Sequence, residues 1–329
     1  MRQLVKLKSF KKTLLTLICL TFYLNCAYAD GTLIWGMSAD VGGLDPNPRI
    51  EASSHIQLGH AFENLAQRDW GYEKTEFGTS PLPLIGKLAT SWHWEGVDLV
   101  FNIRKGVKFH DGSDLDANAI EFNIRRWWDK DFKYYYAPAA TGPSFTMGFV
   151  KNVKVLSKYQ IALNFGENRN WNWLDFLGEM TYWAMVSPKA IKEFGNEAIA
   201  KNPKAASGTG PYKITNYEPG KKLVLEKNAN YWGEKPHLDK IIFRYIPDSA
   251  ARVAALLSGE VHIIDELDPD LMDRVRQSNV AKVYLPGKPN AFSILPNVSQ
   301  PPFNDINVRE AASIAIDRNA IANGLLLGS

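Results

Sequence analysis

The stretch 99–128 constrains the fold most, because its apolar pattern changes from a period of two to one near 3.6. Leu99, Phe101 and Ile103 alternate with other residues, which predicts a half-buried strand. Asp111-Gly112 is a turn dipeptide, and Asp116 can then cap a helix. The apolar positions of that helix are Ala117, Ile120, Ile124, Trp127 and Trp128. This strand, turn and helix contain nothing that is catalytic by residue type.

The longer stretch 88–128 contains the block Leu88-Ala89, Ser91-Trp92, Phe101, Ile103-Arg104, Gly106-Val107, Phe109-His110-Asp111-Gly112 and Ala117. This block closely resembles the signature of the family 5 extracellular solute-binding proteins, the peptide, dipeptide and nickel receptors of bacterial ABC importers. The resemblance continues in two later blocks, at 207–232 and 291–318. It implies an α/β fold of the periplasmic binding-protein kind, type II, in which two lobes enclose the ligand.

The later half of the chain predicts a parallel sheet. A strand at 241–246, a helix that ends before Gly259 and a strand at 261–264 form a βαβ unit. The mature chain also opens with a strand near Thr32. We expect this strand to join the sheet of the βαβ unit.

The resemblance also divides the chain into lobes. It implies a first lobe at 30–287, with 46–206 inserted as a subdomain, and only the start of a truncated second lobe at 288–329. A strand with one or two helices cannot bury its own apolar faces. We therefore expect the apolar side chains of this last segment to be exposed or to fold back on the first lobe; they are Ile294, Ile314, Ile316 and Leu325–Leu327.

The N-terminus resembles a signal peptide. Five Lys and Arg residues precede an apolar run, 13–24, that is too short to span a bilayer. Ala27-Tyr28-Ala29 is a typical cleavage site, which predicts cleavage after Ala29 and a periplasmic mature chain. An uncleaved anchor and a lipoprotein that uses Cys26 are the alternatives, although residues 23–25 make a poor lipobox.

Removal of residues 1–29 changes both the charge and the cysteine content. The 38 Lys and Arg residues fall to 33 against 35 Asp and Glu residues, so the mature net charge is −2 and gives no electrostatic reason to bind nucleic acid. Both cysteines, Cys19 and Cys26, lie in the removed part, so the mature chain has neither a disulfide nor a thiol nucleophile.

No motif in the mature chain indicates an enzyme or a cofactor. It lacks H-E-x-x-H and G-x-S-x-G. His55 and His60 are five residues apart and fall on different helix faces, and 265–270 lacks the glycine of a calcium loop. The segment 207–210 has no third glycine and precedes a strand, which excludes a nucleotide-binding loop. We predict no catalytic residue, no metal site and no cofactor.

The resemblance implies that the chain delivers small peptides to an inner-membrane ABC permease and its ATPase subunits. We expect a monomer, and the near-neutral mature charge predicts that it binds no nucleic acid. Nickel chelates, haem and oligosaccharides are alternative ligands within the family, and a non-functional truncated remnant is a further alternative.

Candidate ligand-binding residues come from three segments. The loop after the first strand faces the cleft in the family, and its small residues suit main-chain recognition of a peptide. The tyrosines belong to a long aromatic loop and could equally pack on a neighbouring helix. The glycines permit close backbone approach, which suits a cleft wall. The candidates are Met37, Ser38, Ala39, Asp40, Tyr134, Tyr135, Tyr136, Gly208, Thr209 and Gly210.

Overall fold

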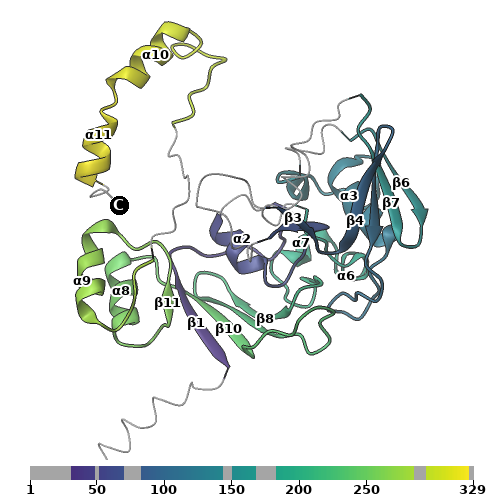
Figure 1. Cartoon of the computed structure of the whole chain (residues 1–329), viewed down its shortest axis with the longest axis horizontal. Helices are drawn as coiled ribbons and strands as arrows, with labels where there is room; N and C mark the ends of the chain where they lie inside the picture. The colour runs from purple at the N-terminus through teal and green to yellow at the C-terminus, as the bar shows by residue number, and fades with distance from the viewer. Residues whose placement is uncertain are drawn as a thin grey trace, which may run out of the picture.

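The computed structural model describes residues 31–48, 52–69, 83–143, 150–167, 183–284 and 294–325, and the predicted signal peptide lies outside them. Two larger sheets organise this part of the chain (Figure 1). The helices are α2 (Ala52–Leu58), α3 (Ala117–Trp128), α6 (Pro188–Phe194), α7 (Asn196–Ile199), α8 (Ser249–Leu257), α9 (Met272–Ser278), α10 (Ile306–Ala315) and α11 (Arg318–Ala320). Short 3-10 or π turns are η1 (Ala137–Ala140), η2 (Pro269–Leu271) and η3 (Ile321–Leu325).

The first sheet has five strands in the order β11-β1-β10-β9-β8. Its strands are β1 (Thr32–Met37), β8 (Tyr212–Glu218), β9 (Lys222–Lys227), β10 (Lys240–Tyr245) and β11 (Ile263–Ile264). β1 runs parallel to both β10 and β11, with Trp35 opposite Phe243 on one side and Ile263 on the other. The strand near Thr32 thus has the two neighbours expected from the βαβ pattern.

Helices cover both faces of this sheet. α8 and α9 pack Val253, Leu256 and Val275 on one face, next to Ile34 and Ile264. The opposite face is covered by Leu58, Phe62, Ile191 and Ile199, which come from α2, α6, α7 and the turn after α2. α8 starts where the Asp248 carboxylate accepts the Ala251 amide at 2.7 Å, and Gly259 ends its turn at φ +78°.

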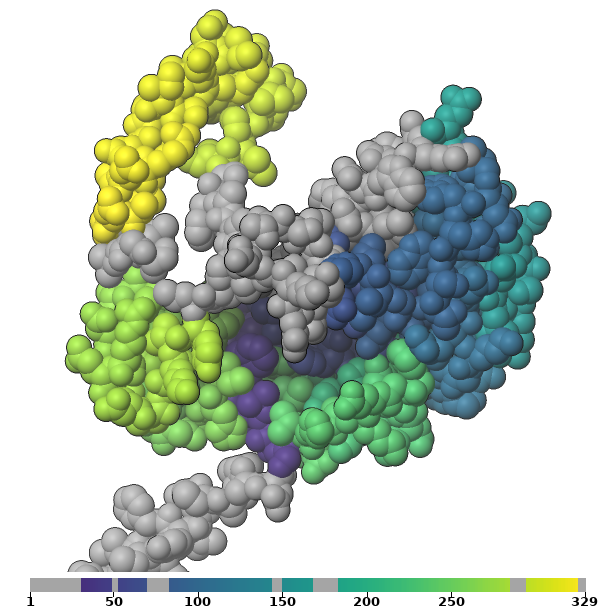
Figure 2. Space-filling view, viewed as in Figure 1, coloured from purple at the N-terminus to yellow at the C-terminus, as the bar shows by residue number. Residues whose placement is uncertain are grey.

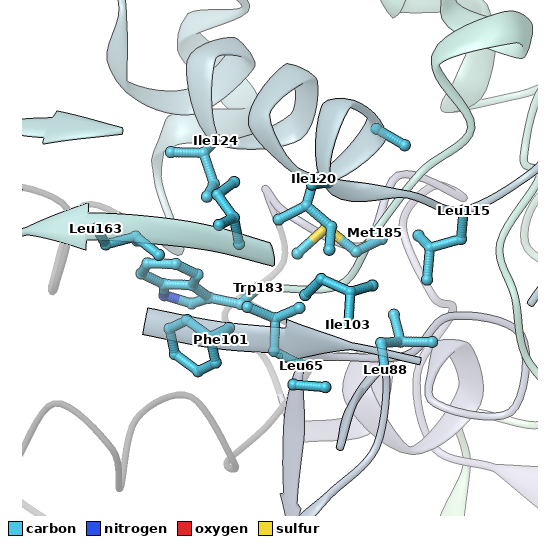
Figure 3. Close-up of a cluster of buried hydrophobic side chains, with 14 of the residues drawn as sticks. Leu65, Leu88, Phe101, Ile103, Leu115, Ile120, Ile124, Leu163, Trp183 and Met185 are labelled. Atoms are coloured by element: carbon cyan, nitrogen blue, oxygen red, sulfur yellow. The ribbon is translucent and has the colours of Figure 1, made fainter. Parts of the chain in front are cut away.

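The second sheet comes from the middle of the chain and has the order β4-β5-β7-β6. Its strands are β4 (Ala89–Glu95), β5 (Asp98–Ile103), β6 (Asn152–Ser157) and β7 (Gln160–Asn164). α3 lies across one face and buries Ile120 and Ile124 against Phe101 and Leu163 (Figure 3). The predicted cap is present, because the Asp116 carboxylate accepts the Ala119 amide at 3.0 Å.

The segment 46–206 contributes to two hydrophobic cores, one on each of the two larger sheets. Its flanks, with α2, α6 and α7, pack on the five-stranded sheet, whereas its middle forms the four-stranded one. Between α2 and β4, the chain forms a two-stranded sheet of β2 (Ala66–Arg68) and β3 (Leu84–Gly86). The boundaries of the first lobe and of its insertion therefore stay a prediction.

Residues 294–325 project from the body of the molecule (Figure 2). α10 and α11 bury no side chain, and Ile294 and Ile314 are 81% and 75% exposed, as the segment's composition led us to expect. Ile316 is only half-buried, and the side chains of residues 325–327 lie outside the description. None of the helices in the described ranges has the length and apolar character needed to cross a membrane.

Candidate functional site

A pocket lies at one edge of the five-stranded sheet. β1, β10 and β11 are parallel, so their carboxyl ends meet at the same edge, and crevices at such edges commonly bind ligands. The three following loops enclose an open pocket of about 580 Å³. Its wall consists of Ser38, Ala39, Pro247, Asp248, Ser249, Ala250, Arg252, Glu266, Asp268, Asp270 and Leu271.

The loop after β1 is held from the β11 side by Asp265. The carboxylate of Asp265 accepts the Ser38 amide at 2.7 Å and the Ser38 hydroxyl at 3.0 Å. These two bonds place the Ser38 and Ala39 backbone at the pocket wall. Burial raises the pKa of Asp265, and the hydrogen bonds from Ser38 oppose this rise.

The same loop is held from its other side by two further contacts. The Asp40 carboxylate accepts the Tyr217 hydroxyl at 2.9 Å and the Gly220 amide, both on the β8–β9 hairpin. Tyr245 accepts the Val41 amide at 3.4 Å and donates to Gln57 of α2 at 2.9 Å. The loop is therefore fixed to three neighbouring elements before any ligand arrives.

Arg252 lies beneath the pocket and is 2% exposed. Its guanidinium donates to the carbonyls of Ile246, Pro247 and Glu266 at 2.8–2.9 Å. Its Nε lies 3.8 Å from the Asp265 carboxylate. Arg252 thus ties the β10–α8 loop to the segment after β11.

The wall offers hydroxyl, carboxylate and backbone groups around this buried cation. Asp248 is engaged in capping α8, whereas Glu266, Asp268 and Asp270 extend the acidic rim. A concave wall with a few placed polar groups suits a small polar ligand. In the described ranges, no cluster of three or more His, Cys, Asp or Glu side chains could hold a metal ion.

Of the four candidates after the first strand, the structure places two at this pocket. Ser38 and Ala39 line it, and Ala39 is exposed. Met37 is fully buried in the core of the five-stranded sheet, which corrects the expectation that it faces a cleft. Asp40 is not part of the wall, because its carboxylate holds the hairpin.

The three tyrosines do not reach the pocket. Tyr134 packs on Phe122 with ring centroids 5.1 Å apart, and Tyr136 lies over the Arg126 guanidinium at 5.5 Å. Tyr135 is half-buried, and its amide donates to the Phe132 carbonyl. The structure therefore follows the packing alternative for this loop.

Gly208, Thr209 and Gly210 are buried against residues 60–61 rather than exposed to a cleft. A Cβ on Gly208 would stand 2.1 Å from the Ala61 carbonyl oxygen, and one on Gly210 would stand 2.6 Å from that of His60. The close approach that the glycines predict is present, but its partner is the chain's own backbone. This corrects the expectation of a cleft wall at these residues.

Apart from Ser38 and Ala39, the wall residues were not among the sequence candidates, and neither was Asp265, which holds Ser38 without lining the pocket; Asp265 and Arg252 are the two that order the wall. Asp265 could have been found from the sequence, because it directly follows a predicted parallel strand. Polar residues at the carboxyl ends of parallel strands are site candidates. Arg252 carries no such signal, since a basic residue inside a short helix is usually solvated.

Comparison with known proteins gives matches along most of the chain. The family model described as "Bacterial extracellular solute-binding proteins, family 5 Middle" matches residues 83–329. The chain is 25% identical to the probable D,D-dipeptide-binding periplasmic protein DdpA of Escherichia coli K12, over 98% of this chain and 60% of that protein. It is 27% identical to the nickel-binding periplasmic protein of the same organism, over 98% and 59%.

Among solved structures, the chain is similar to the ABC transporter-associated periplasmic binding protein DppA of Helicobacter pylori in complex with the peptide STSA. The TM-score is 0.73 at 25% identity, over 91% of this chain and 59% of that one. The predicted α/β, type II periplasmic binding-protein fold is thereby confirmed. The chain spans about 60% of the length of the curated relatives it matches.

Proposed function

Because this chain belongs to the family 5 bacterial extracellular solute-binding proteins, we propose that it is the periplasmic protein that delivers small peptides to an ABC importer. The observation that carries this proposal is the pocket at the carboxyl ends of β1, β10 and β11. Its wall presents the backbone of the loop after β1, fixed by Asp265 and Asp40. Fixed main-chain groups suit the backbone of an extended peptide.

Ser38 and Ala39 are the proposed ligand contacts within this lobe. Both line the pocket, and both belong to the loop that the neighbouring elements hold in place. A ligand gains affinity when the site is ordered in advance, because less conformational entropy is lost on binding. A peptide in this pocket would meet a backbone that needs no rearrangement.

The proposal includes the parts of a transport system that lie outside this chain. The partners are an inner-membrane permease and its ATPase subunits, and the protein acts as a monomer without enzymatic activity. Its first lobe is 30–287, with the insertion at 46–206, and residues 288–329 begin the second lobe. Support comes from the family match and from periplasmic relatives such as DdpA.

Isothermal titration with three probes tests the ligand class. The purified protein would be titrated with the tetrapeptide Ser-Thr-Ser-Ala, with D-alanyl-D-alanine and with Ni²⁺, which represent the ligands named for its relatives. We expect a peptide to bind and Ni²⁺ alone not to bind. Binding of Ni²⁺ without either peptide would reject the proposal.

A further inference from the structure

The contact between Asp265 and Ser38 joins two pocket loops that are 227 residues apart in the chain. It consists of two hydrogen bonds to one carboxylate, from the Ser38 amide and the Ser38 hydroxyl. Hydrogen bonds to a charged group are stronger than those between neutral groups. No other hydrogen bond or ion pair among the described residues holds the Ser38 side chain.

The backbone beside Asp265 is unusual. Glu266 has φ +43°, a left-handed conformation that a residue with a side chain rarely adopts. The Glu266 carbonyl accepts the Arg252 guanidinium at 2.8 Å, and Arg252 is almost completely buried. Strained backbone that is held in this way tends to occur at functional sites. The turn is thus maintained by α8 and directs the Asp265 carboxylate at Ser38.

We propose that Asp265 is a positioning residue for ligand binding, which acts through Ser38 and fixes the loop after β1 at the pocket wall. This inference rests on the proposed function of the pocket. Asp265 is not itself a wall residue, so its effect on a ligand passes through Ser38 and Ala39. Arg252 supports it by holding Glu266 and by lying 3.8 Å from its carboxylate.

Three variants separate positioning from charge. Asp265→Ala removes both acceptors, whereas Asp265→Asn keeps the shape and one acceptor for the Ser38 amide. Asp273→Ala is the matched control, because Asp273 is an exposed carboxylate outside the pocket that contacts only Arg276, at 3.4 Å, among the described residues. Each variant would be measured in two ways, by the exchange rate of the Ser38 amide hydrogen and by the Kd of the peptide that binds the wild-type protein.

We expect Asp265→Ala to accelerate Ser38 amide exchange and to raise Kd, each by about tenfold or more. Asp265→Asn should give intermediate values, and Asp273→Ala should change neither. Equal effects of Asp265→Ala and Asp273→Ala would overturn the proposal, as would faster exchange with an unchanged Kd. If no peptide binds the wild-type protein, the proposed function fails. An unchanged Ser38 amide exchange rate in Asp265→Ala would refute only the inference that Asp265 positions Ser38.

Discussion

The loop after β1 and the segment 207–210 both place small residues next to a strand, but of the two only the loop lines a pocket. Ala39 is exposed at the pocket, whereas Gly208 lies against the Ala61 carbonyl. The difference arises from what covers each segment. The loop after β1 lies at a sheet edge, while the segment 207–210 is hydrogen-bonded to the turn after α2 through Gly210 and to His110 through Gly208.

Small residues thus allow close approach without specifying the partner. In the segment 207–210 the partner is the chain itself, and the contact stabilises the fold. In the loop after β1 the small side chains leave a pocket, which none of the other residues that the structure describes fills. Substitutions in the two segments should therefore affect different properties, stability in one and ligand affinity in the other.

The largest effect is expected from Gly208→Ala. The added Cβ would stand 2.1 Å from a backbone oxygen that no rotamer change can move, so we expect a loss of more than about 3 kcal/mol in unfolding free energy. Gly112→Ala is the control. Gly112 has φ +82°, and a Cβ added there would meet no described atom within 4 Å beyond its chain neighbours, so the loss should be about 1 kcal/mol. Urea unfolding measures both; equal losses would refute the steric argument.

The next effect concerns Glu63, whose buried carboxylate holds the segment 207–210 in place. It accepts hydrogen bonds from Thr209, Tyr231 and Trp232 at 2.6–2.9 Å, and Lys87 lies 3.2 Å away. We expect Glu63→Gln to cost about 2–3 kcal/mol, because buried donors lose a charged acceptor.

The control for Glu63→Gln is Glu260→Gln, which breaks an exposed pair with Arg244. Exposed pairs contribute little to stability, so this variant should unfold at nearly the wild-type urea concentration. A Glu63→Gln protein as stable as the control would show that the network does not hold the segment.

A pH effect of about 2 kcal/mol is expected from His110. Its imidazole accepts the Gly208 amide at 3.3 Å, and its other nitrogen lies 3.0 Å from the Gly210 carbonyl. Burial lowers the pKa of His110 from about 6.5 to about 4; Lys213 also lowers it, and the Gly210 contact and Asp111 oppose the fall. Between these pH values the unfolded chain binds a proton that the folded chain does not, so stability falls as pH drops from 6.5 to 4.

The full shift corresponds to ~3 kcal/mol, and partial exposure of the ring reduces this figure. Unfolding by urea at pH 7 and pH 4 should show a smaller acid-induced loss for His110→Gln than for the wild-type protein. Parallel losses in the two proteins would assign the acid sensitivity to other groups.

The smallest effect on stability is expected from Ala39→Trp, which tests whether the loop after β1 contributes to ligand affinity. Ala39 is exposed, so the change in unfolding free energy should stay within about 0.5 kcal/mol. A bulky ring at the wall should nevertheless lower the affinity for the peptide that binds the wild-type protein by about tenfold, by occupying the pocket. A clearly destabilised protein would show that Ala39 is packed in the fold. Unchanged peptide affinity would contradict the proposal that this loop contacts the ligand.

The local elements could be predicted from the sequence because their causes lie within a few residues. α3 begins after Asp116 and buries Ile120 and Ile124, as their spacing indicates. β5 follows the alternation of Leu99, Phe101 and Ile103, although Val100 is buried as well. The family signature then identified the fold, which the comparison with solved structures confirms.

The candidate site could be predicted only in part. Ser38 and Ala39 follow the first strand, and a loop after a parallel strand is a site candidate from its position alone. The sequence does not show that Met37 points into the core or that the Asp40 carboxylate is taken by a hairpin residue 177 positions later. These outcomes depend on which segments pack beside the loop.

The strand and helix periods, the caps and the family could all be read from the residues alone, because each depends on residue type and near spacing. Which small residues face a pocket and which face the chain depends instead on how distant segments pack together. This packing also brought Asp265 to Ser38, and this contact exists only because β1 and β11 pair in parallel. A side chain's surroundings are set by distant segments, and their arrangement is encoded by the core as a whole rather than by any short motif.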